Sequence, residues 1–354
     1  AILSTILGTG MAQAGGWDRS GQDTSIIVKD GNLLEVTSVS VAPKITGKYT
    51  GASAGTSTGD VAPDYSFTNI AFRTDINDDF SIALIQDEPF GAGVDWATGT
   101  GEYTLVKAKI DTKATTLLIA YDLDDVTVFG GLKNQTFGAS AQVPLNASTL
   151  YAITSTPDTS LGYVVGAAIE RPEIALRVAL TYHTKITHNV AIVETLNGAS
   201  STSSTLTADT PSSFNLDFQT GVAANTLLFG TIRSVKWTQT ELKPGLYSGS
   251  TGGLSLKKFT SDTMSYSIGL GRKFSDEWSG AVTYGTEAAE GTAGSPLGPT
   301  DGYSKMGVGV TYAAEQANIT LGVQQINNGS TVAPKANMSG NTTLVTAVKV
   351  AYKF

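Results

Sequence analysis

Cysteine is absent from this 354-residue chain, and histidine occurs only twice, at His183 and His188. The lack of cysteine excludes disulfides, thiolate catalysis and cysteine-based zinc sites, and two histidines leave little room for a metalloenzyme or a histidine-based triad. Charged residues make up only 15% of the chain, against about 25% in an average soluble domain. The net charge of −8 argues against nucleic acid as a partner, because proteins that bind phosphates present a basic face.

Long apolar runs are also missing. After residue 14 there is no stretch of about 20 apolar residues, so we expect no transmembrane helix. Residues 1–14 combine a short apolar run with Ala12-Gln13-Ala14, a small-x-small cleavage pattern. We interpret them as the remnant of a secretory signal peptide, which makes Gly15 the start of the mature chain; an ordinary buried N-terminal segment is the alternative. Export without a helical anchor leaves the periplasm, secretion or the outer membrane.

The dominant pattern in the sequence is an alternation of apolar with small or polar residues. Near the C-terminus, apolar side chains share one face with lysines on the other, and the segments 174–185 and 264–274 also alternate. A period of two residues indicates β-strands with one apolar face. In the C-terminal segment the apolar face consists of Leu344, Val348, Val350, Tyr352 and Phe354, opposite Lys349 and Lys353.

Short polar turns alternate with long stretches rich in Gly, Ser, Thr and Pro. The turns lie near 77–79, 123–125, 171–172, 224–225, 275–276 and 314–315, and the long loops near 48–62, 91–103, 141–158, 190–212, 241–260, 290–301 and 328–340. An even number of strands with short periplasmic turns and long outer loops is typical of a transmembrane β-barrel. We therefore predict an all-β fold, a 14-stranded antiparallel transmembrane barrel over 33–354. A soluble β-sandwich, the alternative, has shorter strands.

Two terminal features support export and assembly of a barrel. Phe354, preceded by Tyr352 and Val350 at two-residue steps, resembles the C-terminal signal that the barrel assembly machinery reads, so this machinery is an expected partner. Residues 15–32 carry an apolar centre, Ile26, Ile27 and Val28, in an otherwise polar segment. Because the interior of such a barrel needs filling, we predict an N-terminal hatch whose apolar centre contacts ligand or the barrel wall; a disordered periplasmic tail is the alternative.

The segment that begins the mature chain, Gly15-Gly16-Trp17-Asp18-Arg19-Ser20, resembles that of FadL/TodX-type proteins, the outer-membrane transporters of long-chain fatty acids and hydrocarbons, in their alphaproteobacterial form. Three further stretches resemble the same family, and the similarity runs over nearly the whole mature chain: Ala175-Leu176-Arg177-Val178-Ala179-Leu180-Thr181-Tyr182, Phe274-Ser275-Asp276-Glu277-Trp278-Ser279-Gly280-Ala281 and Leu297-Gly298-Pro299-Thr300-Asp301-Gly302-Tyr303. The resemblance implies a fourteen-stranded barrel, an N-terminal hatch, and an inward kink in the third strand that opens sideways into the bilayer. The Asn-Pro-Ala element in the hatch of the better-known members is missing here.

The third predicted strand starts with regular alternation at Phe80 and then meets Pro89, Phe90, Gly91 and Gly93. Proline has no N–H to donate to a neighbouring strand, and glycine permits backbone angles that bend a strand. We predict that Pro89, Phe90 and Gly91 border a sideways opening. The alternative is that Pro89 begins an outer loop beyond the membrane.

We expect no catalytic residue, metal site or cofactor. A nucleophile needs a base within about 3 Å and a third group that orients it, and nothing near His183 or His188 supplies them. The acidic turns at 75–79 and 122–125 could be calcium ligands, but Asp and Asn in hairpin turns commonly bond their own backbone. A general or selective diffusion porin for small hydrophilic solutes is the rival function. It needs charged rings along a wet constriction, whereas the predicted inward positions are mostly small.

The sequence therefore predicts a monomeric outer-membrane channel for passive uptake of hydrophobic compounds: long-chain fatty acids, hydrocarbons or aromatics. The ligand would bind in an apolar pocket, since burial of each CH₂ contributes about 0.8 kcal/mol, and leave laterally into outer-membrane lipid. A charged head group would meet inward cations, for which the candidates are Arg177, Lys185, Lys349 and Lys353.

Overall fold

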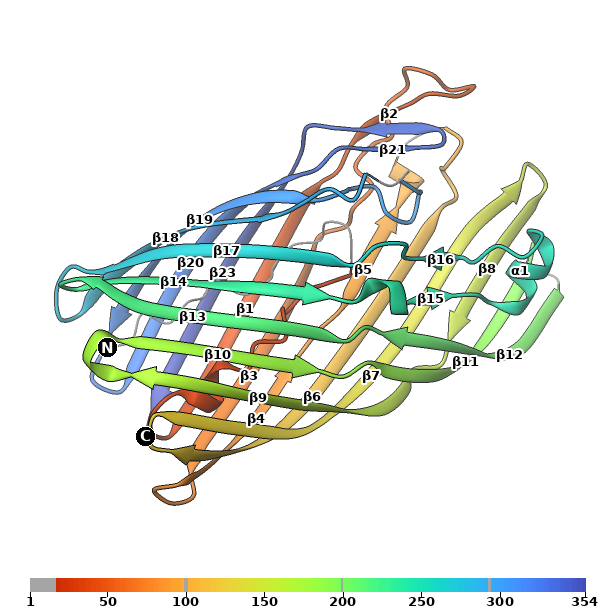
Figure 1. Cartoon of the computed structure of the whole chain (residues 1–354). Helices are drawn as coiled ribbons and strands as arrows, with labels where there is room; N and C mark the ends of the chain where they lie inside the picture. Colours follow the sequence, from red (N-terminus) through yellow and green to blue (C-terminus); the bar gives the residue numbers. More distant parts are fainter. Residues whose placement is uncertain (1–16, 99–100, 199, 292–293) are drawn as a thin grey trace.

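The computed structural model describes residues 17–98, 101–198, 200–291 and 294–354. Eighteen of the described strands join edge to edge into one closed antiparallel barrel (Figure 1). Closure comes from β1 (Leu33–Lys44), which pairs with β3 (Tyr65–Asp75) on one edge and with β23 (Asn341–Lys353) on the other. The described part of the chain has no helix that is both long and apolar enough to cross a membrane.

Fourteen wall segments form the barrel, as predicted, and four of them are broken into two successive strands. The remaining segments in chain order, with the broken ones joined by "then", are β4 (Phe80–Asp87) then β5 (Gly91–Asp95), β6 (Lys107–Leu123), β7 (Val126–Asn146), β8 (Thr149–Ser155) then β9 (Asp158–Arg171), β10 (Leu176–His183) then β11 (Ile186–Leu196), β12 (Ser200–Thr210) then β13 (Ser213–Ala223), β14 (Thr226–Val235), β17 (Thr263–Lys273), β18 (Trp278–Glu287), β19 (Tyr303–Ala313) and β20 (Ala317–Asn328).

Smaller elements lie in the connections. They are the strands β2 (Gly47–Tyr49), β15 (Glu241–Leu242), β16 (Lys257–Lys258), β21 (Thr331–Ala333) and β22 (Ala336–Met338), the helix α1 (Gly245–Ser250), and the 3₁₀ turns η1 (Ser25–Val28), η2 (Trp96–Thr98), η3 (Pro172–Ile174) and η4 (Trp237–Gln239). Short turns connect the strands at one end of the barrel, which we call the turn end. The longer connections lie at the opposite end, the loop end.

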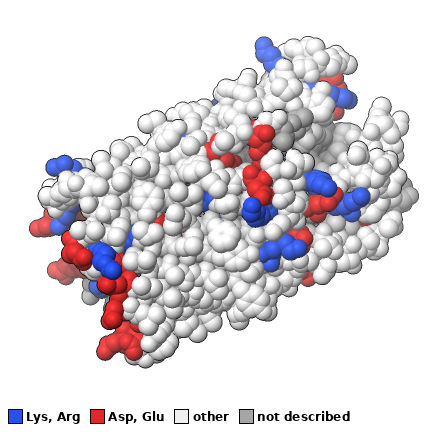
Figure 2. All heavy atoms as spheres, viewed as in Figure 1, with Lys and Arg blue, Asp and Glu red and all other residues white. Residues whose placement is uncertain are grey.

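The outer surface of the barrel is apolar along most of its height. On β17, Met264, Tyr266, Ile268 and Leu270 point outward and are each about half exposed, while the residues between them are Ser or Gly. Figure 2 shows charged side chains gathered at the turn end and around the outer connections, with a broad surface almost free of charge between them. An outward apolar band with small or polar inward residues is the pattern of a barrel surrounded by hydrocarbon.

Aromatic pairs mark the turn end of this band. The rings of Phe80 and Tyr121 lie 4.7 Å apart, and those of Trp278 and Tyr312 lie 5.0 Å apart. Aromatic rings with one polar end favour the boundary between lipid and water. The band therefore ends near the short turns.

Two of the seven predicted long loops are wrong. The segments 141–158 and 190–212 are mostly strand, because β7, β8, β11 and β12 extend beyond the rest of the barrel as two long hairpins (Figure 1). The second hairpin turns at Asn197 and Gly198, whose φ angles of 53° and 70° are left-handed, as expected for an Asn-Gly turn between strands. The predicted loop at 91–103 also begins too early, because β5 occupies its first five residues.

In three adjacent wall segments, the alternation of inward and outward side chains shifts by one residue at the same height. Inward side chains in β10 occupy odd-numbered positions such as Thr181 and His183, whereas those in β11 occupy even-numbered positions such as Ile186 and His188. Similar shifts separate β8 from β9 and β12 from β13. A strand that gains one residue bends and exchanges its two faces. The loop-end part of this wall is thus set at an angle to the part below it (Figure 1).

The interior has three layers. Along β7 the inward side chains include Phe129, Lys133 and Phe137, and all three are buried. Phe129 belongs to an apolar cluster near the turn end, and Phe137 to an apolar cluster near the loop end. Lys133 belongs to a polar layer between them, and the N-terminal segment, residues 17–32, lies across all three layers.

Candidate functional site

The lower part of the N-terminal segment is apolar. The turn η1 places Ile26, Ile27 and Val28 in the lumen with at most 7% of each exposed. They pack against wall residues of the turn-end cluster, which comprises Ala83, Ile85, Leu118, Ala120, Phe129, Val164, Ala168 and Ala179. Of the two partners predicted for these side chains, the barrel wall is the one they touch here.

The middle of the segment is held by an ion pair. Arg233 of β14, which is 2% exposed, donates from Nε to Asp18 Oδ2 (2.5 Å) and from Nη2 to Asp18 Oδ1 (3.1 Å). The same guanidinium donates to Asn215 Oδ1 (2.7 Å) and Gln22 Oε1 (3.0 Å). Opposite, the Ser20 hydroxyl donates to Asp87 Oδ2 of β4 (2.5 Å). Bidentate arginine–carboxylate pairing fixes geometry as well as energy, so this polar layer sets the position of the segment.

Above the polar layer, aromatic rings from distant parts of the chain meet. Trp17 packs edge-on against Phe259 (5.1 Å between ring centroids) and Trp237 (6.2 Å), and Phe90 packs edge-on against Trp237 (5.5 Å). Further members of this loop-end cluster are Ile110, Phe137, Tyr151, Ile153, Val190, Ile192, Leu206, Ala208, Val235 and Leu242. The N-terminal segment thus contributes one ring to an apolar site built mostly by the wall and the 236–262 connection.

A cavity of about 60 Å³ adjoins Trp17 and Phe259. Its lining is apolar except at a few positions, and one of these is Lys257, whose Nζ lies 4.4 Å from the centroid of the Phe259 ring. Burial lowers the pKa of Lys257. An ammonium over a ring face is stabilised by the ring quadrupole. The site therefore offers one cation beside apolar surface.

The third wall segment breaks at Pro89. Pairing of β4 with β6 ends at Asp87↔Ala114 and pairing of β5 with β6 begins at Gly91↔Asp111, so the broken segment has one residue more than β6. Phe90 keeps contact with β6 through Thr112, whose Oγ1 accepts from the Phe90 N–H (2.9 Å). Pairing resumes beyond the break, so Pro89 interrupts a wall strand and does not begin an outer loop.

The backbone groups freed by this break are taken up by the N-terminal segment. Arg19 N donates to Pro89 O (3.0 Å), Ser20 N donates to Glu88 O (3.2 Å), and Gly91 N donates to Trp17 O (2.6 Å). Residues 17–20 therefore lie along the edge that β3 would otherwise occupy. Unpaired backbone is costly in a barrel wall that faces lipid, and this pairing removes the cost on the β5 side.

On the β3 side the edge stays open. Pairing of β3 with β4 stops at Ile70↔Gln86, so within the described structure residues 65–69 of β3 bond to β1 alone. A cavity of about 500 Å³ adjoins this edge; Arg19, Tyr65, Ala92, Val94 and Ile153 are among its lining residues. Pro89, Phe90 and Gly91 thus lie beside a stretch where, among the described residues, no strand pairing joins β3 to β5. We call this stretch of the wall the lateral gap.

The four predicted head-group cations do not meet at the apolar site. Lys349 is buried near the turn end and pairs with Glu35 (2.8 Å), and Arg177 pairs with Glu170. The inward placement of Lys185 is wrong: it is exposed and pairs with Asp209 (2.9 Å). The cause is the phase shift between β10 and β11, which puts Lys185 on the outer face. Sequence reasoning missed the cations that do lie near the apolar site, Arg19, Arg233 and Lys257.

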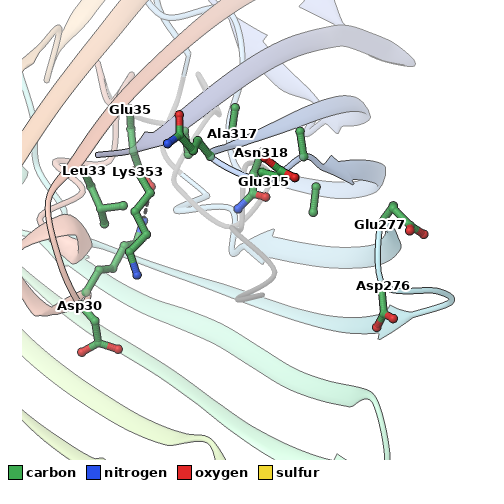
Figure 3. Close-up of a pocket in the computed structure, with 14 residues that line it drawn as sticks. Asp30, Leu33, Glu35, Asp276, Glu277, Glu315, Ala317, Asn318 and Lys353 are labelled. Carbon is green, nitrogen blue, oxygen red and sulfur yellow. Dashed lines mark hydrogen bonds and ion pairs between the residues drawn. The ribbon is translucent and has the colours of Figure 1, made fainter.

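A third cavity, of about 510 Å³, opens at the turn end (Figure 3). Lys353 lines it beside Glu35, and Asp276 and Glu277 lie across it on the turn between β17 and β18. Lys29 of the N-terminal segment lies in the same cavity and pairs with Glu35 (2.7 Å). Charges of both signs make this mouth hydrophilic, in contrast to the loop-end cluster.

The histidines have structural partners. His188 Nδ1 lies 3.2 Å from Asp158 Oδ2 and its Nε2 lies 3.4 Å from Gln135 Nε2, while His183 Nδ1 lies 3.4 Å from Lys133 Nζ. Among the described residues, the side-chain contacts of the two rings are with Asp158, Gln135 and Lys133, and none is with a serine or threonine hydroxyl. Within the described residues no group of three or more His, Asp or Glu side chains is arranged to hold a metal ion. In the first acidic turn, Asn77 Oδ1 accepts from two backbone N–H groups, as in an ordinary hairpin turn.

Comparison with known proteins identifies the family. A search of curated proteins gives no match. Among solved structures, a Pseudomonas aeruginosa FadL homologue superposes with a TM-score of 0.80 at 15% identity, covering 98% of this chain and 97% of that one. The Pseudomonas putida toluene transporter TodX gives 0.65 at 12% identity (96% and 96%), and the Ralstonia pickettii toluene transporter TbuX gives 0.63 at 11% (98% and 98%).

At these identities the superpositions establish the fold alone. The model of the family "Outer membrane protein transport protein (OMPP1/FadL/TodX)" matches residues 26–353, which is nearly the whole chain. The resemblance seen in the sequence is confirmed. The chain belongs to the FadL/TodX family, and it is an outer-membrane transport channel, not an enzyme.

Proposed function

We propose that this channel takes up hydrophobic small molecules passively, holds them in the loop-end cluster and releases them sideways through the gap between β3 and β5. The observation that carries the proposal is the break in the ladder. Residues 65–69 of β3 face a gap in the wall at the height of the aromatic cluster. Such a gap suits an apolar molecule, which gains by passing into lipid without first meeting water.

The closed cluster has too little space for such a ligand. Its cavity of about 60 Å³ is smaller than the roughly 150 Å³ that holds a benzene ring in a protein core. A ligand that binds in the cavity beside Trp17 and Phe259 must therefore displace a ring, and Trp17 is the ring carried by the N-terminal segment. In this proposal residues 15–32 are the hatch, residues 33–354 are the barrel, and residues 1–14, which lie outside the described part of the chain, are a signal remnant.

Ligand binding is testable by tryptophan fluorescence, because two of the four tryptophans lie in the cluster and Trp278 lies outside on the barrel surface. We expect purified protein in detergent to show saturable quenching by toluene, dodecane or dodecanoate. Trp17→Phe and Trp237→Phe should each lose a large share of the change, and Trp278→Phe should retain it. Absence of a saturable change with all three probes would refute the proposal.

The rival function, a porin for hydrophilic solutes, is separated by conductance. The N-terminal segment crosses the middle of the lumen, so we expect low conductance in planar bilayers and a large rise when residues 15–29 are deleted. A high conductance of the intact chain would favour the porin. No rise on deletion would mean that something other than the N-terminal segment closes the lumen.

The sideways exit requires its own test. Gly93 lies on β5 beside the gap, where an added Cβ would come 3.2 Å from Pro63 Cγ. Gly93→Trp should slow growth on a hydrophobic carbon source while leaving ligand binding and heat-modifiability intact. Val165→Trp, at an exposed site on β9, is the matched control. Equal growth of the two variants would place the exit elsewhere.

We further propose that the chain is a monomer inserted by the barrel assembly machinery. Phe354 is 54% exposed and its ring stacks on Phe72 at 5.9 Å, which leaves it accessible as a terminal signal. Phe354→Ala should lower the amount of heat-modifiable barrel in the outer membrane at unchanged synthesis. Normal insertion of this variant would contradict the assignment.

A further inference from the structure

The lateral gap is occupied by one side chain of the N-terminal segment. Arg19 is only 6% exposed, and its Cζ lies 4.5 Å from the centroid of the Tyr65 ring on β3. On the other side of the gap, Nη1 lies 3.1 Å from Glu88 Oε2 and 3.7 Å from Asp111 Oδ1. The guanidinium therefore touches β3, the break in the third segment, and β6. It bridges the two edges that no strand pairing joins.

The missing side chain of Gly91 makes this position available. A Cβ built at Gly91 would overlap the Arg19 guanidinium. Gly91 also accommodates Trp17, whose carbonyl accepts from its N–H (2.6 Å). Glycine allows this close approach of another chain segment, and a larger residue would push the Arg19 guanidinium out of the gap.

The same side chain is incompletely satisfied. Arg19 Nε is buried and has no hydrogen-bond partner among the residues that the structure describes, although burial of an unpaired donor carries a penalty of about 1–3 kcal/mol. A guanidinium held this way is stabilised by two carboxylates and one ring face but has lost part of its hydration. Its place in the gap is thus less favourable than that of Arg233, whose donors meet several acceptors.

Arg19 is also linked to the ligand site by a short stretch of backbone. Trp17 contributes a ring to the loop-end cluster, and Asp18, between the two, is held by Arg233. A ligand that displaces the Trp17 ring must shift the strand-like contact of residues 17–20 with residues 88–91. Arg19 would move with that contact, because its own N–H is bonded to Pro89 O.

We propose that Arg19 is the gating residue of the lateral opening: its guanidinium closes the gap between β3 and β5, and displacement of Trp17 by an apolar ligand withdraws it. The inference rests on the proposed sideways release and names the group that controls it. A charged plug is suited to this role because an apolar molecule gains nothing by replacing its two carboxylate contacts directly. The ligand opens the gap only by acting at Trp17.

The absence of cysteine allows a direct test with one introduced thiol. Ala92 lines the cavity at the gap and packs against the loop-end cluster. The A92C protein, folded in liposomes, is treated with a lipid-soluble maleimide, and the labelling rate is measured. We expect a rise of about tenfold or more when Arg19→Ala is added, and none when Arg171→Ala is added. Arg171 is an exposed arginine at the turn end with its own carboxylate partner, Asp125 (2.5 Å).

A second variant keeps Arg19 and moves it. Gly91→Ala should raise the labelling rate in the same way, because the added methyl group displaces the guanidinium. Toluene should raise the rate of the A92C protein and have little further effect once Arg19 is Ala. Equal rates with and without Arg19, in barrels that are heat-modifiable, would overturn the inference. Failure of the proposed function is seen in a separate experiment, as absence of toluene binding in the fluorescence titration. The labelling rates measured without ligand do not depend on toluene binding, so the two failures are distinguishable.

Discussion

The polar layer predicts how firmly the N-terminal segment is held. Arg233→Met removes a guanidinium that is 2% exposed and leaves the Asp18 carboxylate, 17% exposed, without its cation. Breaking a buried pair by removing one partner costs about 3–5 kcal/mol, and the partial exposure of Asp18 favours the lower end. At about 1.4 kcal/mol for each factor of ten, release of the segment should become roughly 100-fold more frequent.

The assay is single-channel recording in planar bilayers, where we expect rare open events in the wild type to become frequent in Arg233→Met. Asp18→Asn should have a smaller effect, because Arg233 retains Asn215 and Gln22 as acceptors. The double variant Arg233→Met/Asp18→Asn should destabilise the closed segment by less than the sum of the two single variants, since no unpaired charge remains. Arg171→Met, which breaks an exposed pair, should change little. If Arg233→Met showed open events as rarely as the wild type, the view that this pair anchors the segment would be refuted.

Further predictions follow from the loop end. Glu194 is buried and accepts from Tyr151 OH (2.9 Å) and the N–H groups of Leu246 (3.2 Å) and Tyr247 (3.1 Å). Glu194→Gln should cost about 1–3 kcal/mol locally and speed proteolysis within 236–262, whereas Glu277→Gln should not. Lys257→Met should weaken dodecanoate binding several-fold and leave toluene binding unchanged. Because burial lowers the pKa of Lys257, its charge is lost as pH rises through that lowered value, so dodecanoate affinity should fall there while toluene affinity stays constant.

The sequence predicted the fold well because a membrane barrel repeats one rule. Each strand shows lipid one face, so the outward residues of β23, such as Leu344 and Val348, follow the expected alternation. The rule fails where a strand gains a residue, because the resulting exchange of inward and outward positions is not visible in the amino-acid composition. Lys185 was assigned to the wrong face for this reason. The Ser/Thr-rich segment 190–212 suggested a loop, yet Asn197-Gly198 was an available hairpin signal.

The site was only partly predictable for a different reason. Pro89, Phe90 and Gly91 could be placed at a break, since proline and glycine act through their own backbone. Arg19 and Arg233 act through partners more than 60 residues away in the chain, Glu88 and Asp18, and no local pattern reveals such pairs. Lys257 contacts Phe259, two residues away, but its place beside Trp17 depends on how the 236–262 connection packs against the N-terminal segment. Arg19 meets Glu88 and Tyr65 only because the barrel closes around the N-terminal segment.

The chemistry of the lumen suits the proposed hatch, which would have to move to admit a ligand. A hatch held only by apolar packing would have to expose that apolar surface in order to leave, at about 25 cal/mol for each Å². Here the segment is positioned by Asp18 and Ser20, which can exchange their protein partners for water, while its apolar contacts are confined to η1 and Trp17. Charge pairs in a lumen gain little net stability over hydration, but they fix one geometry. In the function proposed above, an apolar ligand competes for the Trp17 contact alone, and Trp17 is the part of the segment that lies beside the gap.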